Sequence, residues 1–434
     1  MMDSMKPEKQ SVAVAIRGDD GTFLAVRRPD DPEDPLGGLW GLPAVTMADQ
    51  EDELAAAIRV GHAKLGVKLA LGQKIGAKTA DRGEYVLFLS EYEATIASGT
   101  PSVPQPDHSM TQYADFAFTD DPQLLDEAAT EGSLCAKIFL EHTAGVERDR
   151  VAEFRRRNGL THLIDVHTHF MPHRLLAAVW AYFDAGGPLL GRVWPIRYRS
   201  EEQRRLEVLR GFGVRAFTSM LYPHKPGMAR SLNDWAAGFA ERNADCLHSA
   251  TFFAESSAPA DVRHAMDQGA RVFKCHLQVG GFDPNDPLLD DAWGTLAEAG
   301  IPVVTHCGSG PVAGRHTGPG PMAELLARHP SLRLVVAHLG MPEYAQFLDL
   351  AERYSGVLLD TTMAFTRFVE VTAPFPRAEL PRLAALGDRV LLGTDYPNIP
   401  YTYADALEAL EQAGLGAAWL RAVCHDNAAR LFAL

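Results

Sequence analysis

The chain has 434 residues, which exceeds the length of one ordinary domain unless much of it forms an α/β barrel of about 250 residues, so we predict two domains. Hydrophobic residues make up 46% and charged residues 22%, a composition that is typical of a globular chain with a large core. The formal net charge of −15 would repel a phosphate backbone or an anionic membrane surface, which argues against nucleic acid and membranes as partners.

Cysteine usage and the N-terminal sequence bear on the cellular compartment. The five cysteines are widely separated and form no Cys-x-x-Cys pair, as expected for reduced thiols. The N-terminal segment lacks the apolar core of a signal peptide, and no apolar run approaches the roughly 18 residues of a membrane span. We therefore expect a cytoplasmic protein that acts on a small-molecule substrate. The sequence leaves the oligomeric state open, with a homo-oligomer as one alternative.

Residues 1–145 are predicted to form a small α+β unit. The β-rich runs 11–17 (SVAVAIR) and 22–28 (TFLAVRR) flank the turn 18–21, which is the pattern of a hairpin. Residues 51–65 have apolar side chains at helical spacing, and Gly66 follows as a stop. Further strands are predicted at 86–89 and 115–118.

This unit resembles the Nudix hydrolase family in RRP (27–29), GGLWGLP (37–43) and the helix that follows. The residues that match the family's box are Glu51, Arg59, Gly66 and Val67. Val45, however, stands where the box has its leading glycine. The positions of the glutamates that the family uses to hold divalent cations are taken by Val60, Ala63 and Lys64. The resemblance implies a degenerate Nudix-like domain that packs, dimerises or binds a small effector. We expect residues 1–145 to show no magnesium-dependent hydrolysis of nucleoside diphosphate derivatives.

A charged segment separates this unit from the rest of the chain. Residues 121–144 have a helical pattern, and 147–158 form a charged run with little apolar face, which is typical of a solvated helix or tether. We expect a linker over 146–160 and a second domain over 161–434.

The second domain alternates apolar, strand-like runs with helical patterns. The predicted strands are 163–169, 215–221, 247–253, 271–277, 301–307, 332–339, 357–361 and 390–396. The predicted helices include 229–242, 287–299, 322–328 and 342–353. Eight strands that are apolar on both faces and separated by helices predict a parallel (β/α)8 TIM barrel. The fold class is therefore α/β, with a TIM barrel preceded by the smaller α+β unit.

Polar residues gather at the carboxyl ends of these strands, where the active site of a TIM barrel lies. They are His167 and His169 on the first strand, Lys274 and His276 on the fourth, His306 on the fifth, His338 on the sixth and Asp395 on the eighth. The first two histidines are two residues apart, so their side chains project to the same side and can begin a metal site.

These strand ends resemble the amidohydrolase superfamily in its amidohydrolase-related branch, which includes aminocarboxymuconate semialdehyde decarboxylase. The resemblance covers residues 160–434 and rests on DVHTHF (165–170), KCH (274–276), PVVTHCG (302–308), VVAHLG (335–340), LLGTDYP (391–397) and NAARLF (427–432). It implies that His167, His169, His306 and Asp395 bind one divalent metal ion, with zinc as the expected metal. It also implies that His338 and Asp395 take part in catalysis. Three imidazoles and a carboxylate can hold zinc and leave a position for water or substrate.

Several further residues are candidates for binding the substrate. Lys274 and His276 share a face, and a functional and a structural role are equally compatible with both. Tyr222, Arg315 and His316 lie on loops after strands, where cations would favour an anionic group such as a carboxylate.

The leading hypothesis is a metal-dependent hydrolase that uses a metal-bound hydroxide on a small, anionic substrate. A non-oxidative decarboxylase would use the same site, with His338 transferring a proton. A hypothesis of another class is a metabolite-binding or regulatory protein in which the Nudix-like domain is a sensor. Metal content separates this last hypothesis from the two enzymes, and carbon dioxide release separates the enzymes from each other.

Overall fold

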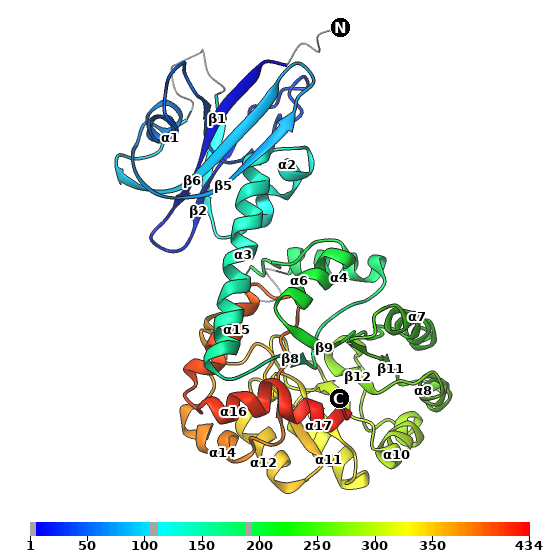
Figure 1. The fold of residues 1–434 in the computed structure, drawn as a ribbon. Coiled ribbons are helices and arrows are strands. Elements are labelled where there is room, and N and C mark those ends of the chain that lie inside the picture. The colour runs from blue at the N-terminus through cyan, green and yellow to red at the C-terminus, as the bar shows by residue number, and fades with distance from the viewer. Residues whose placement is uncertain (1–5, 104–111, 187–192) are drawn as a thin grey trace. The chain divides into compact units, whose positions relative to one another are not determined.

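The structure is a computed structural model that describes residues 6–103, 112–186 and 193–434. Residues 1–5 lie outside the described residues; they begin the N-terminal segment that was predicted to contain no signal peptide. The chain divides into two compact units, Met1–Glu147 and Arg148–Leu434, and each is described by itself (Figure 1). Within the described ranges, no helix combines the length and the apolar character needed to cross a membrane.

The N-terminal unit is built on a mixed sheet. Its strands are β1 (Glu8–Arg17), β2 (Phe23–Arg27), β3 (Trp40–Gly41), β4 (Ala44–Thr46), β5 (Lys68–Asp81), β6 (Val86–Ser98) and β7 (Asp115–Thr119). The order is β3-β2-β1-β6-β5, with β4 also paired to β1 and β7 to β2. Strand β1 pairs antiparallel with β2 across the predicted hairpin and parallel with β6, so it lies at the centre.

Side chains of β1 alternate between two cores, as expected for a strand buried on both faces. Val12 and Val14 pack on one face, in the cluster that helix α1 (Glu53–Val60) covers. Ala13 packs on the other face, in the cluster that receives the first turns of helix α3 (Leu134–Arg157). Short helix α2 (Asp126–Thr130) precedes α3. The predicted α+β unit is therefore confirmed.

The predicted helix over 51–65 consists of α1 and a π-helical turn, Gly61–Leu65, that ends at Gly66 with a φ of 70°. Asp52 begins the helix by accepting a hydrogen bond from the backbone N–H of Ala55. Val60 is fully buried and Lys64 is 4% exposed. At these positions a hydrocarbon side chain and an ammonium group stand where the Nudix box has carboxylates.

The second unit is the predicted parallel barrel, which confirms the fold class. Its strands are β8 (Leu163–Asp165), β9 (Val214–Thr218), β10 (Cys246–Leu247), β11 (Ser249–Thr251), β12 (Val272–His276), β13 (Val303–His306), β14 (Leu334–Val336), β15 (Val357–Asp360) and β16 (Val390–Leu391). Segments β10 and β11 together occupy the third of the eight predicted strand positions. The barrel closes between its first and last strands, where Thr168 bridges Tyr396 and the N–H of Val166 donates to the carbonyl of Leu392 at 2.9 Å.

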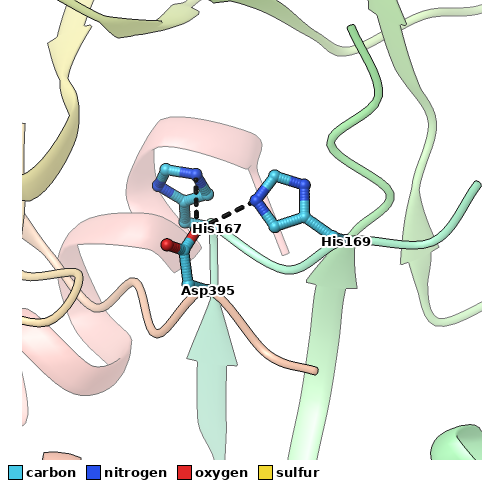
Figure 2. Close-up of side chains that lie close together, drawn as sticks. All are labelled: His167, His169 and Asp395. Atoms are coloured by element: carbon cyan, nitrogen blue, oxygen red, sulfur yellow. Dashed lines mark hydrogen bonds and ion pairs between the residues drawn. The ribbon is translucent and has the colours of Figure 1, made fainter. Parts of the chain in front are cut away.

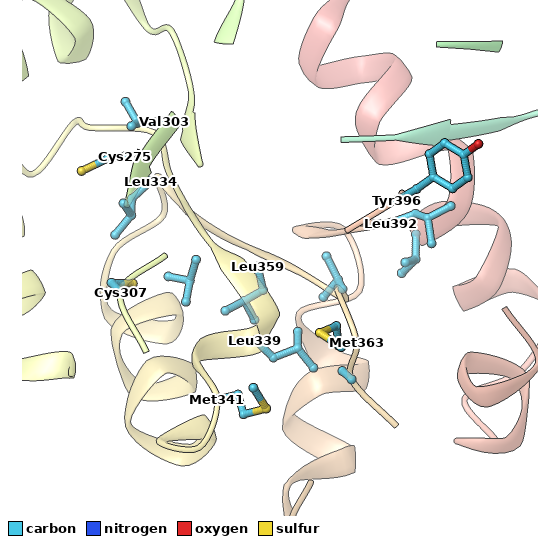
Figure 3. Close-up of a cluster of buried hydrophobic side chains, with 14 of the residues drawn as sticks. Cys275, Val303, Cys307, Leu334, Leu339, Met341, Leu359, Met363, Leu392 and Tyr396 are labelled. Atoms are coloured by element: carbon cyan, nitrogen blue, oxygen red, sulfur yellow. The ribbon is translucent and has the colours of Figure 1, made fainter. Parts of the chain in front are cut away.

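Helices follow the strands around the outside of the barrel (Figure 1). They are α4 (His173–Ala185), α6 (Glu202–Gly211), α7 (Ala229–Arg242), α8 (Ala258–Asp267), α9 (Leu277–Gly280), α10 (Asp290–Ala299), α11 (Pro319–Arg328), α12 (Tyr344–Arg353), α13 (Arg367–Glu370), α14 (Leu380–Ala385), α15 (Tyr403–Gln412), α16 (Ala417–Arg421) and α17 (Asn427–Phe432). Strand side chains alternate again. Val303 packs in the cluster between strands and helices (Figure 3), while Val304 packs inside the barrel.

Most of the segment expected as a linker, 146–160, lies in the second half of α3. Val151 and Phe154 of this half are fully buried in the barrel's core cluster. Arg150 donates to Asp405 and Glu408 of α15, at 2.6 and 2.8 Å. The charged run thus has specific partners on the barrel as well as a solvated side.

Candidate active site

The polar residues at the strand ends surround one cavity of 510 Å³. Its polar end is formed by His167, His169, Lys274, His276, His306, His338 and Asp395. They come from distant parts of the sequence, and the closed barrel brings them together because the carboxyl ends of parallel strands meet at one rim.

His167 lies just beyond β8, and its ring is oriented by the end of β15. The Nδ1 atom lies 2.9 Å from Oδ2 of Asp360 and 3.0 Å from the Thr362 hydroxyl oxygen. Although burial opposes it, the His167 ring holds the pKa of the Asp360 carboxyl well below its ordinary value. A carboxylate can only accept, so the proton of neutral His167 lies on Nδ1 and Nε2 keeps its lone pair.

His169 is held in the same tautomer by a different group. Its Nδ1 atom lies 2.5 Å from the carbonyl oxygen of Met220, which can only accept a hydrogen bond. Its Nε2 atom lies 2.9 Å from Oδ1 of Asp395, and Nε2 of His167 lies 3.2 Å from the same oxygen. Figure 2 shows both rings turned toward this carboxylate. Two bare imidazole nitrogens and an anionic oxygen therefore converge.

The residues of this cluster suit a divalent metal. Ligand atoms of His167, His169 and Asp395 all lie within 4.8 Å of one another. Nitrogen and oxygen donors at about 2.0–2.2 Å from zinc would have comparable separations. Three acceptor atoms that face each other in a buried site favour a cation, because none of them can donate a proton to the other two. The donor set thus fits the metal that the family resemblance implies.

Asp395 is ionised in these surroundings. Burial alone would raise the pKa of its carboxyl, but the His167 and His338 rings hold it well below the ordinary value. The backbone of Asp395 has a φ of 72°, and its N–H donates to the carbonyl of His167 at 2.8 Å. The carboxylate is therefore fixed to the first strand through the backbone.

Lys274 lies inside the barrel beside these ligand atoms. Its Nζ atom is 2.8 Å from Nε2 of His167, and the side chain is fully buried. Burial lowers the pKa of the Lys274 amine. The lysine supplies a donor to one of the bare nitrogens and is in direct contact with the candidate metal ligands.

His306 shares the cavity but faces another group. Its Nε2 atom lies 2.9 Å from the carbonyl oxygen of Gly310, and its ring stacks on His276 with a centroid separation of 4.1 Å. Burial, followed by the charge of His338, lowers the pKa of His306 to about 3, so the ring is neutral. His306 is not among the three residues whose ligand atoms converge. To serve as the fourth ligand, it would have to exchange the Gly310 bond for the metal.

His338 occupies a position suited to proton transfer. Burial lowers the pKa of its ring to about 4, and Nε2 lies 3.9 Å from Oδ2 of Asp395. The Nδ1 atom is buried without a hydrogen-bond partner. The ring of His338 lines the cavity, with Nε2 on the side of Asp395.

Strained backbone surrounds the site. The non-glycine residues with positive φ in the loops after β14, β15 and β16 are His338 (56°), Leu339 (53°), Met363 (62°), Phe365 (64°) and Asp395 (72°). Left-handed backbone is rare for residues with a Cβ, and it concentrates at functional sites.

Apolar side chains form most of the rest of the cavity wall, to which His224, Gln278 and Asn398 also contribute. Helix α4 contributes Leu175, Ala178, Val179, Tyr182 and Phe183, helix α9 contributes Val279, and loops contribute Trp194, Pro311, Met341 and Met363. Tyr222, predicted to contact the substrate, lines the cavity between His169 and His276, with ring centroids at 5.8 and 4.8 Å. The wall therefore suits a substrate with an apolar body.

Two of the predicted substrate-binding residues are not brought into the cavity. Arg315 is exposed, and His316 lies 3.5 Å from the Asp283 carboxylate. Neither residue lines the cavity in the described part of the chain. The cations on which the expectation of an anionic substrate rested thus lie away from the site.

Sequence reasoning missed Asp360, Thr362 and helix α4. The signal for Asp360 was present, because LLDTT (358–362) places a carboxylate at the carboxyl end of a predicted strand. Helix α4 carried no comparable signal, since its apolar face lines a cavity rather than a core.

The comparisons with known proteins agree with this geometry. The family model described as amidohydrolase matches residues 164–434. The chain belongs to the amidohydrolase family. This assignment places the amidohydrolase domain on the barrel. No curated protein sequence gives a significant match.

Solved structures similar to this amidohydrolase include an uncharacterised TIM-barrel protein from Bordetella bronchiseptica, with 19% identity, 63% of this chain and 98% of that chain covered, and a TM-score of 0.51. A second is 5-carboxyvanillate decarboxylase from Sphingomonas paucimobilis, with 17% identity, 63% and 99% coverage, and a TM-score of 0.45. The MutT Nudix hydrolase from Burkholderia pseudomallei is similar at 24% identity, with 28% of this chain and 86% of that chain covered and a TM-score of 0.23.

Proposed function

We propose that this amidohydrolase is a metal-dependent hydrolase of a small substrate with an apolar body. The observation that supports the proposal best is the convergence of His167, His169 and Asp395, whose facing atoms are all acceptors. These three residues would hold the metal, and His306 would complete the set after leaving Gly310. When bound, a divalent metal supplies a Lewis acid that lowers the pKa of water.

Residues of the chain would transfer the proton, contact the scissile group and exclude water. Asp395, ionised beside two histidines, accepts a proton from the attacking water through Oδ2, the oxygen that faces His338. His338, whose Nε2 lies on the side of Asp395, offers this nitrogen to the scissile group of the substrate. The apolar wall from α4 excludes water, which strengthens electrostatic interactions at the polar end.

Non-oxidative decarboxylation is the second candidate, and the apolar wall favours it. A carboxylate held in such surroundings loses hydration, and this loss lowers the barrier to release of carbon dioxide. His338 would then deliver a proton to the carbon that carbon dioxide leaves. Lys274, at the polar end of the cavity, can donate a hydrogen bond to the substrate carboxylate before it is released as carbon dioxide.

Hydrolysis and decarboxylation would both require a bound divalent metal, so metal content tests both candidates. We expect purified protein to contain near-stoichiometric divalent metal by elemental analysis, and Asp395→Ala to lose it. Asp388→Ala removes a carboxylate whose side chain is 75% exposed and serves as the matched control. A wild-type protein without metal would overturn the proposal and favour a binding or regulatory role.

The reaction type requires a separate assay. Protein loaded with zinc or manganese is supplied with panels of aryl esters, lactones, amides and aromatic acids, and carbon dioxide release is measured beside hydrolysis. Hydrolysis that depends on His338 supports the first candidate, whereas carbon dioxide release without hydrolysis replaces it with the second.

A further inference from the structure

One buried carboxylate contacts two different parts of the candidate site. Asp360, the last residue of β15, is fully buried. Its Oδ2 atom lies 2.9 Å from Nδ1 of His167. Its Oδ1 atom accepts the backbone N–H groups of His338 at 2.9 Å and Thr362 at 3.1 Å. The two oxygens thus have separate partners.

We propose that Asp360 is a positioning residue that sets the tautomer of His167 and anchors the backbone of His338 at the same time. The inference rests on the proposed function, because it assigns Asp360 a role toward the metal and the proton-transfer histidine. Asp360 itself touches neither bound metal nor substrate in this scheme.

The tautomer argument depends on which atoms can donate. Because Oδ2 of Asp360 accepts, His167 must carry its proton on Nδ1, and Nε2 stays free to bind a cation. In Asp360→Asn the oxygen would stay with the two backbone N–H groups, since only an acceptor can satisfy them. The new amide NH2 would then face Nδ1 of His167 and donate to it. The ring proton would move to Nε2 and block the metal position.

The second role concerns a strained backbone. His338 has φ 56° and ψ 30°, and Leu339 after it has φ 53°. Such conformations persist only where surrounding groups hold them. The bond from the His338 N–H to Asp360 is the hydrogen bond that fixes the start of this turn. Asp360 thereby places the His338 ring over the cavity.

Close packing restricts Asp360 on the side of Gly393. A Cβ added at Gly393 would lie 2.3 Å from the Thr362 hydroxyl oxygen, 2.8 Å from Cβ of His167 and 3.2 Å from Cγ of Asp360. Backbone of the last strand therefore presses directly on the contact between Asp360 and His167. The pair is locked from the side that faces β16.

The test compares two isosteric substitutions in the full-length chain. Asp360→Asn alters the group that determines the tautomer, whereas Thr362→Val removes only the hydroxyl 3.0 Å from the same nitrogen. Zinc affinity is measured by competition with a chromophoric chelator after metal is stripped and added back. We expect Asp360→Asn to weaken zinc binding by about 10–100-fold. Thr362→Val should change it by about threefold or less. Equal affinity in wild type and Asp360→Asn would overturn the inference.

A spectroscopic measurement tests the tautomer of His167 in the absence of metal. Nitrogen-15 chemical shifts of the metal-stripped full chain report which ring nitrogen of His167 carries the proton. The expected result is protonated Nδ1 in wild type and protonated Nε2 in Asp360→Asn. A wild-type His167 protonated on Nε2 would overturn the inference even if Asp360→Asn did not fold. Absence of zinc binding with the expected tautomers would overturn the proposed function alone.

Discussion

The Nε2 atom of His169 lies 2.9 Å from Oδ1 of Asp395, while the opposite ring nitrogen contacts the carbonyl oxygen of Met220. Because that carbonyl takes the only ring proton, the short distance joins two atoms that both accept. Such a pair repels unless a cation lies beside it. The candidate site is therefore organised for a positive charge before any substrate enters.

His306 decides whether the metal has three or four protein ligands. We expect His306→Ala to lose bound metal to the same extent as His169→Ala, because a fourth donor replaces the Gly310 bond when metal is present. Elemental analysis of the purified variants measures this. His316→Ala, an imidazole outside the cavity, should keep its metal. Full metal content in His306→Ala would show that His306 only positions the loop through Gly310.

Neighbouring alanines of helix α4 test the apolar wall. Ala178 lines the cavity and Ala177 does not, although both are exposed on the same helix. Ala178→Asp should raise KM for an apolar substrate by at least about tenfold, because binding would desolvate the new carboxylate. Ala177→Asp controls for the effect of aspartate on the helix and should leave KM unchanged. Steady-state kinetics with one of the aryl substrates checks this, and equal KM values would place the substrate elsewhere.

Gly393 tests the packing around Asp360 and His167. Gly393→Ala should lower the free energy of unfolding by about 1–3 kcal/mol, the usual cost of overpacking, and should also reduce metal content. Gly320→Ala is the matched control, because a Cβ there has nothing within 4 Å. Alanine at Gly320, in the first turn of α11, should be neutral or stabilising by up to about 1 kcal/mol. Calorimetry and elemental analysis report the two effects, and a stable Gly393→Ala with full metal would contradict the packing argument.

Glu91 predicts a pH dependence in the N-terminal unit. It is fully buried, and neither carboxylate oxygen has a hydrogen-bond partner. Burial raises the pKa of this carboxyl well above its ordinary value, and the charge of Arg17 offsets only part of the rise. The folded unit therefore favours the protonated acid. Its stability is greatest below the unfolded pKa of about 4.3 and falls as pH rises toward the higher folded pKa.

Glu91→Gln removes this titration without changing the shape of the side chain. We expect the variant to be more stable than wild type at pH 8 by about 1–3 kcal/mol and to lose that advantage at pH 5. Thermal unfolding of the full chain at the two pH values measures the difference. Glu84→Gln, in the exposed turn between β5 and β6, should match wild type at both. A constant difference across pH would show that Glu91 does not titrate in the folded unit.

Much of the barrel could be predicted because its strands are buried on both faces and interrupted by amphipathic helices. The expected helix at 229–242 coincides with α7. Each of the eight predicted strand positions contains a strand, although the hydrogen-bonded strands are shorter than predicted. The expected first strand ran to His169, whereas β8 ends at Asp165. Beyond this point the backbone bonds to residues 392–396, which follow β16, and hydrophobic pattern alone does not contain that information.

Strand β5 was not predicted, for a physical reason. It is an edge strand that carries lysines at 68, 74 and 78, so it lacks the alternation of a half-buried strand. Gly76 lies within it because a Cβ there would lie 2.6 Å from Cγ2 of Ile138 in α3. That requirement comes from a helix more than fifty residues away in sequence.

Site residues on strand ends were easier to anticipate than those on loops. The barrel topology fixes where His167, His169 and Asp395 go, and the structure brings their ligand atoms together. Arg315 and His316 follow β13 in a loop whose path no periodic pattern determines, and they lie outside the cavity. Asp360 could have been found from its place at a strand end, but its contact with His167, 193 residues away, could not.

The left-handed backbone around the site has a consequence for attempts to make the protein more heat resistant. Each such non-glycine residue costs on the order of 1–3 kcal/mol, and glycine would relieve the cost. At Phe365 the exchange would sacrifice packing, but at His338 and Asp395 it would remove the reacting groups themselves. Selection for heat resistance and selection for turnover would therefore favour different residues at these positions. A screen that measured only heat resistance would select variants without activity.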